Sequence, residues 1–408
     1  MTTSIVLGLG GCLDSELVLD ENRLQAMADD HAVSLSEVRQ PAEIATERDL
    51  LISVLAFMHE GIGGERYVSG IEALLAVQDR FEHVMTVGGT NVRAGRTLAL
   101  LGHPNVLHVP GRDETFESQL AEGSAVLPGT PRANYVPHLI VQYPQHMRVR
   151  LMGGSIHTSH ANRVILVNDP VSELTPLHDG LADWLRPGGV FVISGLNSIR
   201  NEQILEDRLR ALRGILEQAP VGLRVMYEDA DYHVPAFRRR VWAEITPRAS
   251  VVGMNEDELA SFTGRPVDVT DPSQIASALE TILANLPGGT VMVHSKYWAL
   301  AAGTHARELG GALECGILAA GARYLEGDAA RAESLDTAGE HPTSRVGEAV
   351  AEKLPARIAA PVTVQPAREL RTGAPTTIGL GDTFLGGFIA GVVETGAMLE
   401  TRSTLETT

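Results

Sequence analysis

A glycine-rich turn near the C-terminus carries a carboxylate at the start of a helical segment. Gly379-Leu380-Gly381-Asp382 precedes residues 383–391, whose small and large apolar side chains are typical of a buried helix. Glycines before a helix let backbone N–H groups approach an anion, and the helix dipole favours negative charge there. The turn is therefore a candidate phosphate site, with Asp382 as a candidate general base for phosphoryl transfer to a hydroxyl. Capping of the helix by Asp382 is the alternative interpretation.

The second half of the chain contains the elements that must position this turn. Patterns of buried strands alternate there with patterns of helical periodicity. The strand patterns fall at 189–194, 223–227, 250–253 and 290–294, and the helical patterns at 201–218, 234–246, 255–263 and 272–286. Alternation of this kind predicts an α/β fold, with a mostly parallel sheet covered by helices on both faces.

Two regions lack this alternation and predict a small β-rich lid. After a first strand at 5–9, residues 15–35 show a short apolar–polar alternation. Residues 104–168 contain several strand patterns with few helical patterns between them, which favours antiparallel strands. We expect a large domain of residues 1–14, 36–103 and 169–408, and a discontinuous lid of residues 15–35 and 104–168. A decorated edge of the main sheet is the alternative.

Composition and charge exclude some classes of binding partner and indicate the redox compartment. The 408 residues are 44% hydrophobic, so a sizeable core can form. The net charge of −18 and pI near 5.2 disfavour binding to nucleic acid or to anionic membrane surfaces. Cys12 and Cys315 lie far apart in the sequence, which suits a reducing cytoplasm rather than a disulfide framework. The N-terminal residues lack a basic region, so we expect no secretory signal.

Further motifs follow one another along the chain. They are Gly8-Leu9-Gly10-Gly11-Cys12-Leu13-Asp14, Gly88-Gly89-Thr90-Asn91, Asn162-Arg163-Val164-Ile165, Ile193-Ser194-Gly195-Leu196 and Val252 to Ala260. Together with residues 379–383, this ordered set resembles the ADP-dependent sugar kinases, the glucokinase and phosphofructokinase group of the ribokinase superfamily. The resemblance runs from residue 8 to 391. It implies a ribokinase-like body with a β-lid, and transfer of a phosphoryl group from ADP to a sugar hydroxyl with Mg²⁺ as cofactor and AMP as product.

The resemblance also implies roles for individual residues. Asp382 would deprotonate the sugar hydroxyl, the amides of Gly379, Leu380 and Gly381 would hold the phosphate, and Arg163 would reach the phosphates from the lid. The residues expected to support the metal are Asn255, Glu258 and Glu228. The residues expected to bind the acceptor are Asp14, Glu65, Gly88, Gly89, Asn91 and His138.

Three positions depart from the pattern of that family. The family's H-x-E motif corresponds to Met226-Tyr227-Glu228, so its histidine is absent. Thr90 stands in place of the glutamine of the glucokinase G-G-Q motif, and Cys12 stands where an asparagine is expected. A changed sugar side with an intact phosphate side predicts the same reaction on a modified or different acceptor.

The sequence does not decide which sugar accepts the phosphoryl group or which nucleotide donates it. The lid sequence contains Arg148, Arg150 and Arg163, but the lysines of phosphofructokinase-type members have no counterpart, which favours an unphosphorylated hexose or related polyol over a hexose phosphate. Tyr297 and Trp298 are candidates to stack on adenine. An ATP-dependent ribokinase-like kinase acting on a sugar or nucleoside, and a catalytically weak sugar- or nucleotide-binding regulatory protein, are the alternatives. We expect a cytoplasmic monomer that binds a small sugar and a nucleotide.

Overall fold

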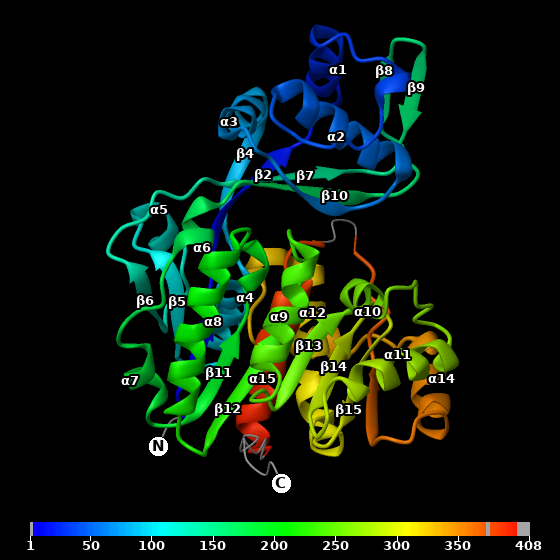
Figure 1. Cartoon of the computed structure of the whole chain (residues 1–408). Coiled ribbons are helices and arrows are strands. Elements are labelled where there is room, and N and C mark those ends of the chain that lie inside the picture. Colours follow the sequence, from blue (N-terminus) through cyan, green and yellow to red (C-terminus); the bar gives the residue numbers. More distant parts are fainter. Residues whose placement is uncertain (1–2, 373–375, 398–408) are drawn as a thin grey trace.

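The larger part of the molecule is built on one nine-stranded sheet (Figure 1). The structure, a computed structural model, describes residues 3–372 and 376–397. The strands in order across the sheet are β16 (Val362–Pro366), β15 (Trp298–Gly303), β14 (Thr290–His294), β13 (Val251–Asn255), β12 (Leu223–Glu228), β11 (Gly189–Ile193), β1 (Ile5–Gly8), β5 (Asn105–Gly111) and β6 (Ser124–Thr130). From β14 to β6 all neighbours are parallel, whereas β15 is antiparallel to both β14 and β16. The predicted α/β class with a mostly parallel sheet is confirmed.

Both faces of this sheet are covered by helices. Successive side chains of a strand point to opposite faces, so Val190 and Val192 of β11 pack on one side and Phe191 and Ile193 on the other. The helices on the first side are α4 (Thr90–Leu100), α12 (Gly310–Glu326) and α15 (Leu380–Thr395), and those on the second are α7 (Leu181–Leu185), α8 (Glu202–Glu217), α9 (Pro235–Ile245), α10 (Glu256–Thr263), α11 (Pro272–Ala284) and α14 (Arg345–Lys353). Helices α8 to α11 confirm the four predicted helical patterns.

A second, five-stranded sheet forms the lid, at the top of Figure 1. Its strands in order are β3 (Gly64–Tyr67), β10 (Asn162–Val167), β7 (His138–Tyr143), β2 (Cys12–Val18) and β4 (Glu82–Gly88). Helices α1 (Glu21–Asp30), α2 (Glu47–Glu60) and α3 (Ile71–Arg80) pack on one face, and the hairpin of β8 (Arg148–Leu151) and β9 (Gly154–His157) lies beside them. The β7–β10 and β8–β9 pairs are antiparallel as expected, but β2–β7 and β3–β10 are parallel.

The predicted boundaries between body and lid are wrong in two places. Strands β3 and β4, within the range 36–103, belong to the lid sheet, and strands β5 and β6, within the range 104–168, extend the body sheet. The apolar pattern of a strand does not reveal which sheet it joins, and α2 is so apolar that it resembles a body helix. The lid strands span residues 12–88 and 138–167.

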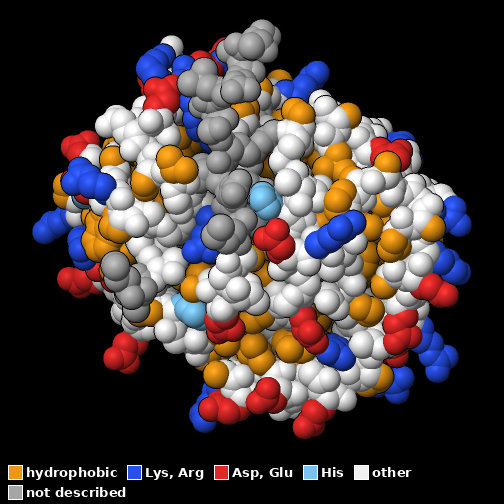
Figure 2. Space-filling model, turned by 90° about the horizontal axis from the view of Figure 1, so that it is seen from below, with side chains coloured by type: hydrophobic (Ala, Val, Ile, Leu, Met, Phe, Trp, Pro, Cys, Tyr) orange, Lys and Arg blue, Asp and Glu red, His pale blue; other side chains and the backbone are white. Residues whose placement is uncertain are grey.

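Short elements complete the fold. They are α5 (Glu114–Glu117), α6 (Pro170–Leu174), α13 (Ser334–Gly339) and several 3₁₀ turns. The face opposite the lid is shown in Figure 2, where acidic and basic side chains are interspersed over the visible surface. Within residues 3–372 and 376–397, no helix combines the length and the apolar character that crossing a membrane requires.

The parallel strands direct their carboxyl ends toward the lid (Figure 1). Strand β12 ends at Glu228, β13 at Asn255 and β14 at His294, so these polar side chains share one edge of the sheet. Ligands of open α/β sheets bind outside this edge. We therefore expect the ligand site at this edge of the sheet, on the side that faces the lid.

Candidate active site

Two cavities meet at the carboxyl edge of the body sheet. The larger, about 890 Å³, lies in the body between α10, α12 and the start of α15. The smaller, about 240 Å³, lies between the lid strands and the body. Arg163, Gly379 and Asp382 line both cavities, so they mark the junction. We call the larger space the donor cavity and the smaller one the acceptor cavity.

The predicted anion turn stands at this junction. Gly379 is the N-cap of α15 and has a φ of 67°, a left-handed conformation that favours glycine. A β-carbon there would also lie 2.6 Å from Cδ of Arg93. The N–H groups of the first helical turn have no partner within the helix, and Leu380 and Gly381 line the donor cavity. This arrangement offers donors and a positive dipole end to an anion.

Asp382 lies inside the first turn of α15 rather than at its cap. Because Gly379 occupies the N-cap position, the capping interpretation of Asp382 is wrong. Among residues 3–372 and 376–397, no group donates a hydrogen bond to the Asp382 carboxylate. Its oxygens therefore remain available to a ligand where the two cavities join.

Arg163 approaches the junction from lid strand β10. Val164 and Leu166 of that strand point into the lid core, whereas Arg163, Ile165 and Val167 face the acceptor cavity. Burial lowers the pKa of Arg163, and the nearby charge of Asp382 opposes this shift. In the described part of the chain, the Arg163 guanidinium has no hydrogen-bond acceptor. Its donors are thus free for an anion at the junction.

A buried network of charged groups forms the lid side of the acceptor cavity. Nη2 of Arg93 donates to Oδ2 of Asp14 at 2.8 Å. His138 stands opposite Asp14 in the β2–β7 register, with Nδ1 3.6 Å from Oδ1 of Asp14 and Nε2 3.3 Å from Oδ2 of Asp169. Burial alone would lower the pKa of His138, but its contacts with Cys12 and Asp169 raise this pKa well above the ordinary value. Burial also raises the pKa of Cys12 to about 12.

Other predicted acceptor residues border the same cavity. Glu65 lines it and its Oε1 is 2.6 Å from Nε2 of His233. Asn91 also lines it, but its Nδ2 donates to the carbonyls of Gly10 at 2.8 Å and His108 at 2.9 Å, so the amide holds the turn after β1 against β5. Asn91 thus supports the cavity wall.

Gly88 and Gly89 mark the point where the chain passes from lid to body. Gly89 lines the acceptor cavity and is the N-cap of α4. A β-carbon on Gly88 would lie 2.3 Å from Oδ2 of Asp14, so only glycine leaves room for that carboxylate. All the predicted acceptor residues except Gly88 thus line the acceptor cavity, and Gly88 packs against Asp14.

Glu228 ends β12, Asn255 ends β13 and Glu258 lies in the first turn of α10; of these three predicted metal residues, only Asn255 lines the donor cavity. Oε2 of Glu228 is buried and has no hydrogen-bond partner in the described structure. Burial, followed by the charges of Asp382 and Asp229, raises the pKa of Glu228 well above its usual range. Burial and the charge of Glu228 likewise raise the pKa of Glu258. A cation would satisfy the orphaned oxygen and relieve this repulsion, so the residues fit a divalent ion.

Asn255 is the N-cap of α10. Its Oδ1 accepts from the N–H groups of Asp257 at 2.8 Å and Glu258 at 2.9 Å, while its own N–H donates to Oε2 of Glu258 at 2.7 Å. This capping box holds the Glu258 side chain against the N-terminus of its own helix.

Comparison with known proteins identifies the family. Residues 3–289 match the family model described as ADP-specific Phosphofructokinase/Glucokinase conserved region. The chain belongs to this family. It is an ADP-dependent sugar kinase, a phosphotransferase with an alcohol group as acceptor. No curated protein matches the sequence.

Solved structures share the fold of this sugar kinase. A hypothetical ADP-dependent phosphofructokinase from Pyrococcus horikoshii OT3 has a TM-score of 0.75 at 18% identity, covering 96% of this chain and 98% of that chain. A phosphofructokinase from the same organism with AMP has a TM-score of 0.75 at 17% identity, with the same coverage. An ADP-dependent kinase in complex with fructose-6-phosphate and ADPβS has a TM-score of 0.66 at 15% identity, covering 94% and 99%. At these identities the likeness shows a common ribokinase-like fold.

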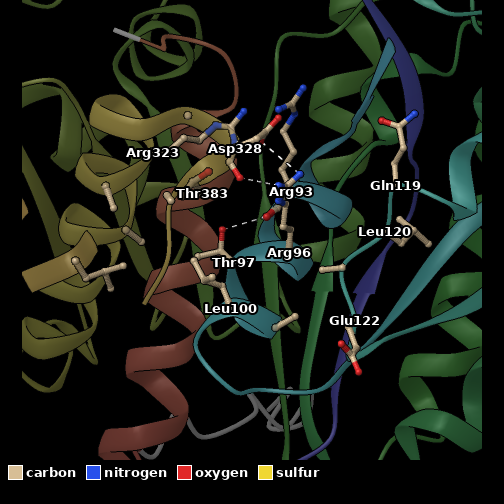
Figure 3. Close-up of a pocket in the computed structure, with 17 residues that line it drawn as sticks. Arg93, Arg96, Thr97, Leu100, Gln119, Leu120, Glu122, Arg323, Asp328 and Thr383 are labelled. Atoms are coloured by element: carbon tan, nitrogen blue, oxygen red, sulfur yellow. Dashed lines mark hydrogen bonds and ion pairs between the residues drawn. The ribbon is translucent and has the colours of Figure 1, made fainter. Parts of the chain in front are cut away.

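Sequence reasoning missed Arg93, which connects the acceptor cavity of the kinase to a third cavity (Figure 3). This cavity of about 500 Å³ lies between α4 and α12 and is bordered by Thr383. From α12, Nε of Arg323 donates to the carbonyl of Ile378 at 2.7 Å and so holds the residue that precedes Gly379 in place. Asp328 pairs with both Arg323 and Arg96. No local signal marks Arg93, because the same helical segment also contains Thr90, Asn91, Arg96 and Thr97.

The predicted adenine contacts are partly wrong. Trp298 is fully buried in the body core, and its Nε1 donates to the carbonyl of Val269 at 2.8 Å, so it cannot stack on a nucleotide. Tyr297 does line the donor cavity, with Nζ of Lys296 4.8 Å from its ring centre. His294, at the end of β14, also lines the donor cavity, and its Nε2 is 3.8 Å from Oε1 of Glu228.

Proposed function

We propose that this kinase transfers the terminal phosphoryl group of ADP to a hydroxyl of an unphosphorylated hexose or related polyol, with AMP as the second product. One observation carries the proposal: Asp382, Arg163 and Gly379 line both cavities. A hydroxyl in the acceptor cavity and a phosphate in the donor cavity therefore meet beside a carboxylate, a guanidinium and a helix N-terminus.

In the proposed mechanism Asp382 accepts the hydroxyl proton as the hydroxyl oxygen bonds to phosphorus and the bond from phosphorus to the AMP oxygen breaks. The N–H groups of residues 379–381 and the guanidinium of Arg163 stabilise the charge on the transferring group. Arg163 comes from the lid, so its contact with the phosphate depends on how the lid sits over the body.

Glu228 and Glu258 are proposed to hold Mg²⁺, directly or through its water ligands. When bound, the ion would neutralise charge on the donor phosphates. Both lone pairs of the Asn255 side-chain oxygen accept backbone N–H groups, so we assign Asn255 the positioning of Glu258 rather than a place among the ligands. The unsatisfied Oε2 of Glu228 is the observation that supports the ion.

Charge in the acceptor cavity supports a neutral acceptor. Asp14, Asp169 and Glu65 supply carboxylate oxygens that accept hydrogen bonds from sugar hydroxyls. Arg93 is engaged by Asp14, and His138 lies between Asp14 and Asp169. Apart from Arg163 at the junction, the cations that line this cavity are already paired with carboxylates, so a second phosphate at the lid end would face carboxylates and paired cations. One chain lines both cavities, which is consistent with a monomer.

The test is an acceptor screen of hexoses, hexose phosphates and nucleosides, run in parallel with ADP and ATP in the presence of Mg²⁺. We expect AMP and sugar phosphate to form in equal amounts from ADP and a neutral sugar. Turnover with ATP and none with ADP would overturn the donor, and turnover with hexose phosphates alone would overturn the acceptor class. Absence of turnover with every acceptor would favour a regulatory binding protein.

A substitution pair tests the base. Asp382→Asn should lower kcat by about 10²–10⁴ while leaving ADP binding within a few-fold. Asp257→Asn makes the same chemical change in a residue that lines the donor cavity without reaching the acceptor cavity, and should change kcat little. Equal losses in both variants would remove the assignment of Asp382 as base.

A further inference from the structure

Cys12, Asp14 and His138 present three metal-binding atoms to the acceptor cavity. Cys12 and Asp14 lie two residues apart on β2, so their side chains share one face of the strand. His138 pairs with Asp14 across β2 and β7. Sγ of Cys12 lies 3.4 Å from Oδ1 of Asp14, and Nδ1 of His138 lies 3.6 Å from the same oxygen. All three ligand atoms fall within 4.8 Å of one another.

These separations match a tetrahedral zinc ion. Zn²⁺ binds cysteine sulfur at about 2.3 Å, histidine nitrogen at about 2.0–2.1 Å and carboxylate oxygen at about 2.0–2.2 Å. At tetrahedral angles, those bond lengths place neighbouring ligand atoms roughly 3.3–3.6 Å apart. The two measured separations around Asp14 lie at these values, so an ion would need little movement of the side chains.

The surrounding groups orient the three ligands. Nε2 of His138 faces Oδ2 of Asp169, whose Oδ1 accepts the N–H of Ser172 at 2.9 Å, and this leaves Nδ1 directed at the cavity. A carboxylate behind a ligating histidine is the usual outer partner of a zinc site. Arg93 engages Oδ2 of Asp14 and leaves Oδ1 toward the thiol and the imidazole. The strands and these partners hold the ligands in place before any ion binds. The ion binds Cys12 as the thiolate and His138 as the neutral imidazole, so binding releases the thiol proton and the Nδ1 proton to solvent.

We propose that Cys12, Asp14 and His138 form a binding site for a thiophilic divalent cation such as Zn²⁺, and that the bound ion excludes the sugar acceptor. The second half of this inference rests on the proposed function. A sulfur and a nitrogen ligand select Zn²⁺ over Mg²⁺, which prefers oxygen ligands and keeps its waters. The fourth position opens into the acceptor cavity, where a water completes the coordination. With Asp14 and His138 occupied by the ion, the cavity loses two of its polar contacts to a sugar.

The site is tested by titrating the metal-free full chain with Co²⁺, a spectroscopic substitute for Zn²⁺. We expect one equivalent to produce a thiolate-to-cobalt charge-transfer band with tetrahedral visible bands, and Zn²⁺ to abolish both. Cys315→Ser is the matched control, because it removes the other cysteine from α12 and should leave the bands unchanged. Cys12→Asn should remove the charge-transfer band and weaken Zn²⁺ binding by about 10–100-fold.

The titration is decisive whether or not the enzyme turns over. No charge-transfer band in the wild-type chain, or an unchanged band in Cys12→Asn, would overturn the site. Circular dichroism checks that Cys12→Asn folds, and Cys12→Ser serves as a second variant. Cobalt bound by Glu228 and Glu258 alone would lack the sulfur band and also count against the proposal.

Exclusion of the acceptor is measured separately by kinetics in buffered Zn²⁺ at fixed Mg²⁺ and ADP. We expect Zn²⁺ to raise the acceptor KM at unchanged kcat, with at least about tenfold weaker inhibition of Cys12→Asn than of Cys315→Ser. Inhibition competitive with ADP, or equal in the two variants, would overturn the exclusion. Failure of every sugar to react would defeat the proposed function, while the cobalt bands would still report on the site.

Discussion

Removal of the Arg93 side-chain charge should destabilise the kinase far more than an equivalent change nearby. Arg93 and Asp14 form an ion pair at 2.8 Å, with side chains only 6% and 8% exposed. Breaking a buried pair by deleting one partner typically costs 3–5 kcal/mol, because the other charge stays buried without compensation. His138 still faces the second oxygen of Asp14 at 3.6 Å, so we expect Arg93→Met to cost about 3 kcal/mol, roughly a hundredfold in the folding equilibrium.

Urea unfolding, followed by tryptophan fluorescence and far-UV circular dichroism, measures this cost. The matched control is Arg96→Met, since Arg96 lies on the same helix, is 41% exposed and pairs with the equally accessible Asp328. Such a surface pair contributes less than about 1 kcal/mol. The double variant Arg93→Met with Asp14→Asn should recover part of the loss, with a coupling energy of about 1–3 kcal/mol. Equal effects of the two methionine variants, or strict additivity in the double variant, would refute the reasoning.

Three further predictions concern the junction and the buried carboxylates. Gly379→Ala forces a left-handed alanine whose β-carbon would crowd Arg93, so it should cost about 1–2 kcal/mol in urea unfolding and lower kcat more than tenfold by misaligning the phosphate N–H groups. Glu228→Gln should stabilise the metal-free protein at neutral pH and raise the Mg²⁺ requirement. The folded-state pKa of Glu228 is raised, so the contribution of Glu228 to the free energy of unfolding falls as pH increases from the unfolded pKa near 4.5 through the folded pKa. If urea unfolding in EDTA gave the wild type and the variant the same dependence of stability on pH, this prediction would be contradicted. His138 also has a raised folded pKa, so its stabilising contribution is complete below about pH 6.5 and is lost as pH rises through that pKa. His138→Gln should reduce the change of the free energy of unfolding with pH, measured by urea unfolding. The same change with pH in wild type and variant would count against a charged imidazole at His138.

The body sheet was predictable because its signals are local. Strands β11 to β14 and helices α8 to α11 follow one another along the chain, and each shows its period within a few residues. The turn that begins α15 was predictable for the same reason, since Gly379, Gly381 and Asp382 are nearly contiguous. The positive end of the helix dipole follows from the start of the helix alone, so it needs no contact with a distant segment.

The lid boundaries and the missed residues depend on contacts distant in sequence. Strand β2 pairs with β4 and β7, and β3 pairs with β10, across segments that include helices and body strands. The alternation of apolar and polar residues along one strand does not reveal which other strand pairs with it. Arg93, Asp169 and His233 likewise reach the acceptor cavity from three separate segments. Each looks ordinary in its own segment, and only the tertiary fold brings them to Asp14, His138 and Glu65.

The division of the site between lid and body explains where this kinase departs from its family pattern. Cys12 and Thr90 both line the acceptor cavity, where a side-chain change alters the contacts offered to a sugar. Glu228 stands at the carboxyl edge of the body, where the charge of Asp382 acts on it, and Glu258 follows in the first turn of α10. The histidine of the H-x-E motif is absent, but His294 of β14 brings an imidazole to 3.8 Å from Glu228, the glutamate of that motif. Acceptor preference can thus change in the lid-facing cavity while the transfer chemistry at the body edge is retained.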